Sequence, residues 1–170
     1  MNDTPHRYGT LSRLLHWGMA VLIGWQLLKM FDRINDGEHW VGQTLVPWHV
    51  SIGALIMLLV IVRLVWAIKQ KDNRPRSEPV ALVKAGHGLL YLGMLVMPIT
   101  GVMYLVGKGY GLKVFGMQLI ARGDGVEWMA SLGSLHSPIA WLLLLLIAGH
   151  VGMALLHHFV KKDDTLKRML

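Results

Sequence analysis

Four apolar stretches, each long enough to cross a lipid bilayer as a helix, divide the chain: residues 14–31, 47–68, 82–106 and 133–160. A spanning α-helix needs roughly twenty mostly apolar residues. Polar or glycine-containing segments separate the stretches, and none of the 10 Asp and Glu residues falls inside one. The pattern predicts an all-α integral membrane protein, a bundle of four transmembrane helices.

The first stretch also resembles the apolar core of a secretory signal peptide. It contains His16, Trp25 and Gln26, however, and it continues into Lys29 with no small-residue cleavage site. We therefore interpret it as a retained first span. An even number of spans returns the two termini to the same side of the membrane.

The composition agrees with a membrane setting. With 54% hydrophobic and only 16% charged residues, and a mean hydropathy of +0.45, the 170-residue chain is too apolar for a soluble domain of its size. We expect residues 1–170 to form a single membrane domain.

The basic residues predict the orientation of this domain. Most of the 17 Lys and Arg residues lie in the N-terminal segment, in the connection between the second and third stretches, or in the C-terminal tail. Cytoplasmic segments of membrane proteins carry the excess of positive charge, so both termini are predicted to be cytoplasmic. The pI of about 9.9 then reflects topology and attraction to anionic lipid headgroups, and nothing in the pattern indicates nucleic-acid binding.

The connections differ in character. Residues 73–79 form a short polar turn, and residues 32–42 an acidic, glycine-containing external loop. The external connection 107–132 is rich in glycine at first and then mixes apolar and charged residues. Because long connections without function are uncommon, we expect it to lie along the outer interface and to cap the bundle there.

Histidines are the unusual feature of the apolar stretches, since an ionisable residue in hydrocarbon is by default a functional-site hypothesis. The fourth stretch contains His136, His150, His157 and His158. His136 and His150 are fourteen residues apart, which places them on nearly one helical face and about 21 Å apart in depth. His157 lies seven residues further along the same face. One helix can therefore hold two groups at different depths.

The predicted topology sorts the histidines into two clusters. His49 and His136 each begin a span at the external surface. The other histidines of the apolar stretches fall in the cytoplasmic half: His16, His87, His150, His157 and His158.

Two clusters of this kind suit haem b. The chain has no cysteine, which excludes iron–sulfur ligation, thiolate-ligated haem and covalent haem attachment. Haem b needs two axial imidazoles at equal depth on facing helices. His49 with His136 meets this demand externally, whereas the internal partner of His150 is either His16 or His87, and helix arithmetic does not choose between them.

Arg63 is a strongly basic residue near the end of the second stretch. It lies fourteen residues after His49, so it points roughly inward at a depth suited to a cytoplasmic haem propionate or an anionic reaction partner. The alternative is a boundary arginine whose side chain extends to the headgroups.

Four short runs in chain order resemble the bacterial cytochrome b561 family, and the resemblance covers essentially the whole chain. The runs are RLLHW at residues 13–17, WHVSIG at 48–53, AGHGLLY at 85–91, and the C-terminal segment from His150 to His158 followed by KDDTLKRM at 162–169.

This resemblance implies a four-helix cytochrome of the inner membrane with two haem b groups, whose characterised member is a superoxide oxidase that passes electrons from periplasmic superoxide to ubiquinone. By position, His49 and His136 would ligate the periplasmic haem, and His16 and His150 the cytoplasmic haem. His87 and His157 would then be free to line a quinone site beside the inner haem, with Arg63 on the propionate or quinone side.

Two further hypotheses stay open. The chain could instead be the membrane anchor that links a periplasmic dehydrogenase or electron-carrier partner to quinone. A haem-free metal transporter is the third possibility, but it would gain from carboxylates inside the spans, and the apolar stretches contain none. The superoxide step rests on the resemblance alone. The external segments carry acidic as well as basic residues, so their charge does not indicate a surface that attracts an anion.

Overall fold

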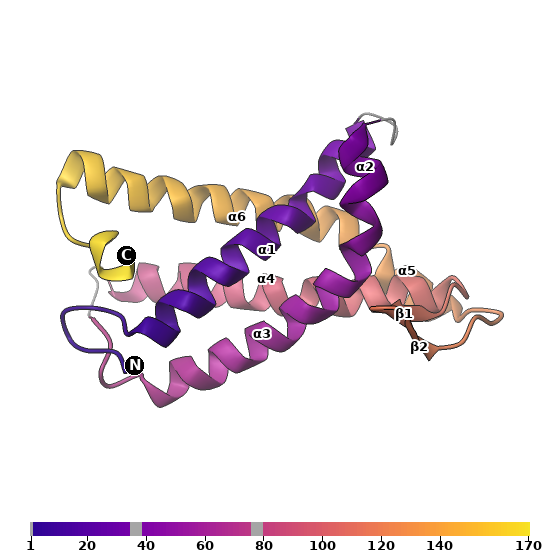
Figure 1. The fold of residues 1–170 in the computed structure, drawn as a ribbon, viewed down its shortest axis with the longest axis horizontal. Coiled ribbons are helices and arrows are strands. Elements are labelled where there is room, and N and C mark those ends of the chain that lie inside the picture. Colours follow the sequence, from indigo (N-terminus) through magenta and orange to yellow (C-terminus); the bar gives the residue numbers. More distant parts are fainter. Residues whose placement is uncertain (1, 35–38, 76–79) are drawn as a thin grey trace.

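In a computed structural model of the chain, described for residues 2–34, 39–75 and 80–170, four long helices form a bundle (Figure 1). They are α1 (Thr10–Ile34), α3 (His49–Lys69), α4 (Val80–Gly107) and α6 (His136–Leu156). Helix α1 packs on α3, α3 on α4, and α4 on α6. Both termini lie at one end of the bundle (Figure 1).

Shorter elements occupy the two ends. At the end far from the termini lie the β1–β2 hairpin and α5 (Figure 1). The short elements are α2 (Trp40–Thr44), the 3-10 turn η1 (Val46–Trp48), β1 (Leu112–Val114), β2 (Met117–Ile120), α5 (Glu127–Gly133), the π-helical turn η2 (His157–Lys161) and the 3-10 turn η3 (Lys167–Met169).

Three segments of the described chain are long and apolar enough to cross a membrane: Trp40–Lys69, Ala81–Gly107 and Glu127–Lys161. They contain the second, third and fourth apolar stretches. Helix α1 has 25 residues but also carries Arg13, His16 and Gln26, and it is not among the three. A fourth span therefore stays a prediction.

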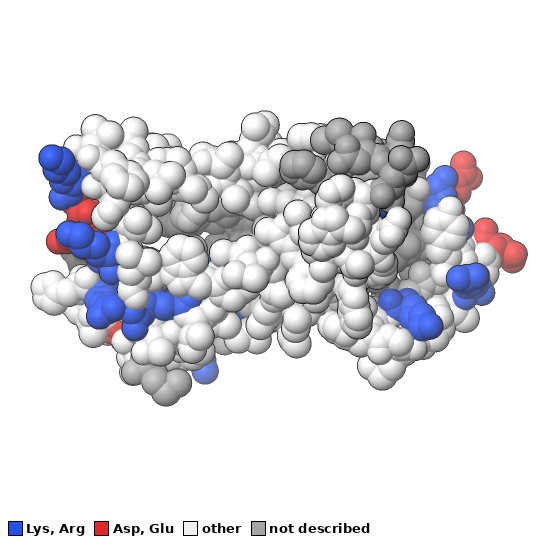
Figure 2. All heavy atoms as spheres, turned by 45° about the horizontal axis from the view of Figure 1, so that its top comes forward, with Lys and Arg blue, Asp and Glu red and all other residues white. Residues whose placement is uncertain are grey.

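The surface agrees with this arrangement. Charged side chains gather at the two ends of the face drawn in Figure 2, and the band between them is largely uncharged. Many large apolar side chains point outward, including Val21 on α1 and Leu145 on α6, each 69% exposed. Such a continuous apolar surface is rare on water-soluble monomers and suits lipid contact.

A small core holds the helices together. Buried side chains from all four long helices meet in it: Met19, Ile52, Ile56, Val60, Met94 and Leu143. This core separates the two ends of the bundle where the histidines gather.

The external connection is more structured than expected. Residues 107–132, predicted as a capping loop, contain an antiparallel hairpin that pairs Val114 with Met117, and also helix α5. Helix α5 lies so close to α4 that a Cβ atom at Gly133 would collide with the backbone of Tyr104. The fold is thus helical apart from one two-stranded hairpin in the part of the chain that the structure describes.

The other two connections also differ in part from the prediction. The expected loop 32–42 is partly helical, since α1 continues to Ile34 and α2 begins at Trp40, while residues 35–38 lie outside the described part. The polar turn 73–79 is described only as far as residue 75.

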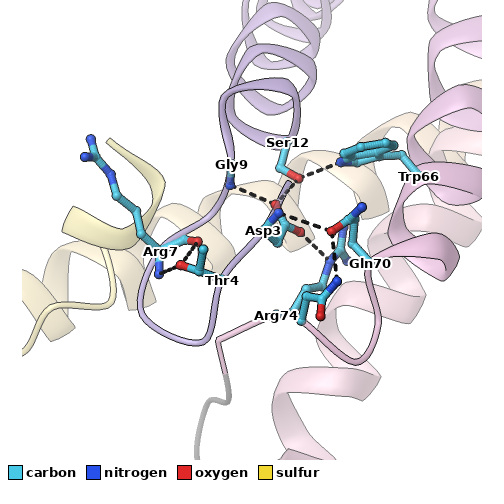
Figure 3. A network of polar contacts seen from close by, with 9 residues as sticks. Asp3, Thr4, Arg7, Gly9, Ser12, Trp66, Gln70 and Arg74 are labelled. Carbon is cyan, nitrogen blue, oxygen red and sulfur yellow. Dashed lines mark hydrogen bonds and ion pairs between the residues drawn. The ribbon is translucent and has the colours of Figure 1, made fainter. Parts of the chain in front are cut away.

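A buried aspartate ties the N-terminal segment to the end of α3 (Figure 3). Asp3 Oδ1 accepts hydrogen bonds from the Gly9 amide at 2.8 Å and the Ser12 hydroxyl at 2.6 Å, and Asp3 Oδ2 pairs with Arg74 Nε at 3.1 Å. Ser12 Oγ also accepts a hydrogen bond from Trp66 Nε1 at 2.8 Å. The network sets the first turn of α1 beside the last turns of α3, and so places His16 within reach of α3.

Candidate functional site: two layers of facing histidines

His49 and His136 face each other at the end of the bundle that carries the hairpin. They are the first residues of α3 and α6, and their ring centres lie 6.0 Å apart with the ring planes at 86°. We call this pair the outer layer. The structure thus brings together the two histidines that the sequence places at one depth.

A backbone hydrogen bond sets the tautomer of His136. Its Nδ1 atom lies 2.9 Å from the carbonyl oxygen of Met97 on α4, which can only accept a hydrogen bond. Nδ1 therefore carries the hydrogen and Nε2 keeps its lone pair. Metal-binding histidines commonly donate their second ring N–H in this way.

Gly101 makes room for this ring. A Cβ atom there would stand 3.1 Å from His136 Cε1 and 3.2 Å from Nδ1, closer than ordinary van der Waals contact. The absence of a side chain at this point of α4 allows the imidazole to lie against the helix and reach Met97.

The hairpin turn lies beside the outer layer. The Phe115 amide donates a hydrogen bond to Ser51 Oγ at 2.9 Å, and the Phe115 ring centre lies 6.5 Å from that of Trp48, the residue before His49. Gln26 Nε2 donates to the His49 carbonyl at 3.0 Å, which links α1 to the same region. The external connection thus covers the start of α3.

Three histidines meet at the other end of the bundle, and we call them the inner layer. The ring centre of His150 lies 6.1 Å from that of His16 and 5.5 Å from that of His87. The rings come from α6, α1 and α4. Both candidate partners of His150 are therefore in reach, as the sequence had left open.

The donor chemistry of both layers fits haem iron. Two imidazole nitrogens that bind one metal at the usual distance of about 2 Å place their ring centres about 6 Å apart. The His49–His136 pair, at 6.0 Å, and the His16–His150 pair, at 6.1 Å, have this separation, whereas His87 lies closer to His150. Both His16 and His87 lie close enough to His150 to form a ligand pair with it, so the ring distances do not choose between them.

Arg63 reaches into the inner layer. Its Nη2 atom lies 2.8 Å from His16 Nδ1, and its Cζ atom lies 5.6 Å from the ring centre of Tyr91. The guanidinium thus faces the bundle interior, as the inward interpretation of the sequence requires.

This hydrogen bond sets a condition on the inner layer. A guanidinium can only donate, so His16 Nδ1 accepts and a neutral ring then carries its hydrogen on Nε2. The same ring cannot accept at Nδ1 and bind a metal through Nε2 while it stays neutral. If His16 were to hold haem through Nε2, the Arg63 guanidinium would have to donate to another acceptor.

The remaining histidines lie outside the two layers. His157 contacts the C-terminal tail, with Nδ1 2.5 Å from Asp163 Oδ2, and His158 lies edge-on to Phe159. His39 caps α2 and is exposed, as is His6. The structure thus places His87 in the inner layer and His157 at the tail.

Several contributing residues had no recognisable signal in the sequence. The Met97 carbonyl and Gly101 act through the approach of α4 to α6, which no local pattern predicts. Asp163 lies in the KDDTLKRM run that carries the family resemblance, but nothing in that run indicates its pairing with His157.

A bare metal site has no support from the described residues. Among them, no group of three or more His, Asp or Glu side chains is arranged to hold a metal ion. The haem-free transporter hypothesis gains nothing from this part of the chain.

Apolar helices long enough to span a membrane, with histidines facing each other at both ends of the bundle, form the arrangement that a haem-binding membrane cytochrome requires. Residues 7–170 match the family described as prokaryotic cytochrome b561, and the chain belongs to this family. It is a membrane protein of an electron-transfer family, and membership implies binding of haem b.

Relatives of the chain match over nearly its whole length. It is 33% identical to "Cytochrome b561 homolog 2" of Escherichia coli (strain K12), over 99% of this chain and 93% of the relative. It is 27% identical to "Probable superoxide oxidase CybB" of Yersinia pestis, over 96% of each. It is 28% identical to "Cytochrome b562" of Cereibacter sphaeroides, over 96% of this chain and 94% of the relative.

Proposed function

We propose that this protein is a cytochrome of the bacterial inner membrane with two haem b groups and four spans, both termini cytoplasmic, that takes electrons from periplasmic superoxide and delivers them to ubiquinone. The presence of at least two facing histidines in each layer carries the proposal. The relative named as a probable superoxide oxidase supports the choice of donor.

The residues have distinct roles in this proposal. His49 and His136 would hold the outer haem, and His16 and His150 the inner one. Haem supplies reversible one-electron chemistry when it is bound. The core residues between the layers, among them Met19 and Leu143, exclude water from the interior.

The outer end must admit a small anion. Superoxide needs only to approach the outer layer and lose one electron, which leaves dioxygen. Positive charge would speed its encounter. Lys108, Lys113 and Arg122 lie in the external connection, together with Asp124 and Glu127. The gain in encounter rate from this mixed set is therefore small.

The inner end must supply protons as well as electrons. Two electrons and two protons convert ubiquinone to ubiquinol, so two superoxide anions are consumed for each quinol formed. We place the quinone near His87 and His157, whose rings can hydrogen-bond a quinone oxygen. The Arg63 guanidinium would pair either with a carboxylate of a haem propionate or with the quinone bound beside the inner layer.

A second candidate is an anchor subunit that receives electrons from a periplasmic partner protein. Exposed apolar side chains at the hairpin end favour it: Met117 is 62% exposed, Leu119 59% and Trp128 61%. A partner protein could cover such a surface, as could the membrane interface.

A pulse of superoxide given to anaerobic, oxidised protein separates these functions. A superoxide oxidase predicts rapid haem reduction, followed by reoxidation when ubiquinone is present. An anchor subunit predicts that haem stays oxidised after the pulse and becomes reduced only when a partner donor is added. Failure of haem reduction by superoxide would overturn the proposed donor.

A further inference from the structure

The C-terminal end of α6 carries a hydrogen-bonded chain of three ionisable side chains outside the two layers. His157 Nδ1 lies 2.5 Å from Asp163 Oδ2, and Lys161 Nζ lies 3.4 Å from His157 Nε2. His157 opens the π-helical turn η2, and π-turns are frequent at functional sites.

The partners on the two ring nitrogens define one tautomer. A lysine ammonium can only donate, so Nε2 of His157 accepts from Lys161. Nδ1 then carries the hydrogen and donates it to Asp163. The ring is therefore held in one orientation from both sides.

Two hydrogen bonds donated by backbone amides of the C-terminal tail hold Asp163 beside the His157 ring. The Asp163 amide donates to the His157 carbonyl at 3.2 Å, and the Thr165 amide donates to Asp163 Oδ1 at 2.9 Å. Lys162, which directly precedes Asp163 in the chain, has a φ of +54°, a left-handed conformation that few residues other than glycine adopt. This turn folds the tail back onto His157.

The pair also bridges the protein interior and water. The His157 side chain is 17% exposed and that of Asp163 39% exposed. Hydrogen bonds from the Thr165 hydroxyl and amide, and then from His157, hold the pKa of Asp163 well below its usual range. The carboxylate is therefore ionised at neutral pH and can balance a positive ring.

We propose that Asp163 is a positioning residue for His157: it holds the ring by its Nδ1–H and supplies the negative charge that lets Nε2 take a proton from water and pass it to a quinone oxygen. This inference rests on the proposed function, in which His157 lines the quinone site. A carboxylate that orients and balances a catalytic histidine is a recurrent arrangement in proton transfer.

The proton balance is as follows. Nε2 first gains a proton from cytoplasmic water, and Lys161 leaves that nitrogen because two donors cannot share it. When the quinone has been reduced, the Nε2–H bond breaks and an O–H bond forms on the quinone oxygen. The ring returns to its neutral form with Nδ1–H still on Asp163, and water supplies the next proton.

The test uses the full-length, haem-loaded protein with ubiquinone-1 as acceptor, and three variants. Asp163→Asn keeps the size of the side chain and removes its charge, and Asp163→Glu restores the charge. Asp164→Asn is the matched control, because Asp164 is the neighbouring acidic residue and its carboxylate pairs with exposed Lys167 at 2.9 Å instead of with a histidine.

We expect Asp163→Asn to retain full haem content and to lower kcat for quinone reduction by roughly 100-fold, the lower end of the usual contribution of acid–base catalysis, with KM nearly unchanged. Asp163→Glu should recover most of kcat, and Asp164→Asn should match the wild type. In ¹⁵N NMR, the Nδ1–H signal of His157 should be present in the wild type and shifted in Asp163→Asn, because a neutral amide oxygen accepts a weaker hydrogen bond than a carboxylate.

An unchanged kcat and an unchanged His157 signal in Asp163→Asn would overturn the inference. So would a joint loss of haem content and quinone affinity that Asp163→Glu fails to recover, since that indicates a purely structural role. If wild-type haem is not oxidised by ubiquinone, the proposed function fails, and the NMR measurement still shows separately whether Asp163 orients His157.

Discussion

The imidazole of His136 donates its Nδ1 hydrogen to the backbone carbonyl of Met97, across a distance of 2.9 Å between α6 and α4. This contact leaves Nε2 as the nitrogen with a free lone pair. The outer layer therefore offers the Nε2 lone pair of His136 to haem iron, whereas in the inner layer Arg63 donates to His16 Nδ1.

The space at Gly101 should control the outer haem. In Gly101→Ala the new Cβ atom would press on the His136 ring, and overpacking of this kind costs about 1–3 kcal/mol. We expect outer-haem affinity to fall roughly 5- to 150-fold while the inner haem is retained, as measured by haem titration of the apoprotein. Gly88→Ala on the same helix, where a Cβ meets nothing within 4 Å, is the control. Equal haem affinities in the two variants would contradict this account of the outer layer.

Arg63 should raise the reduction potential of the inner haem. A positive charge stabilises the reduced centre, and at a distance of about 10 Å with an effective dielectric constant of about 20 it contributes roughly 1–2 kcal/mol, or about 60 mV. A redox titration of Arg63→Met should therefore show the inner potential lowered by about that amount and the outer one unchanged. Arg63→Lys keeps the charge and should stay near the wild type. A shift in the reduction potential of the outer haem instead would contradict the assignment of Arg63 to the inner layer.

The docking of the C-terminal tail should depend on acid pH through Asp163. Because the folded pKa of this carboxyl lies below its unfolded value of about 3.9, its contribution to tail docking is complete above that value and is lost as the pH falls through the folded pKa. The chain has no cysteine, so a spin label on Leu170→Cys reports tail mobility without background. Mobility should rise between about pH 4 and pH 2.

The matched comparison for this titration is Asp163→Asn with the same label. Its tail should already be more mobile at pH 7 and should show a weaker response over the acid range. A wild-type tail that stays equally immobile at pH 2, or a variant that titrates like the wild type, would refute the role of this carboxylate.

Sequence reasoning could predict the long helices and the grouping of the histidines at the two ends of the bundle, because both follow from period and length. The positions of His49 and His136 at the starts of two apolar stretches were enough to place them together. The partner of His150 could not be predicted in this way, because His16 and His87 lie at similar depth, and the choice depends on how α1 and α4 approach α6.

The hairpin and the polar contacts of the site lay beyond local patterns. Leu112 and Val114 are buried on either side of exposed Lys113, but a three-residue alternation is too short to predict a strand. The bonds from His136 to Met97 and from Arg63 to His16 join residues 39 and 47 positions apart, so they depend on helix packing. The pairing of Asp163 with His157 depends on the left-handed turn at Lys162, which the sequence does not signal because lysine seldom adopts it.

The haem content of single histidine variants tests the central claim of two haem-binding histidine layers most directly. Purified wild-type protein should bind two haem b groups per chain, His49→Ala and His150→Ala should each retain one, and the exposed His6→Ala should retain both. The two single-haem variants should also differ from each other in their reduced optical spectra, because each keeps a different layer. Two haems in either His49→Ala or His150→Ala, or a wild-type protein that binds none, would contradict the account.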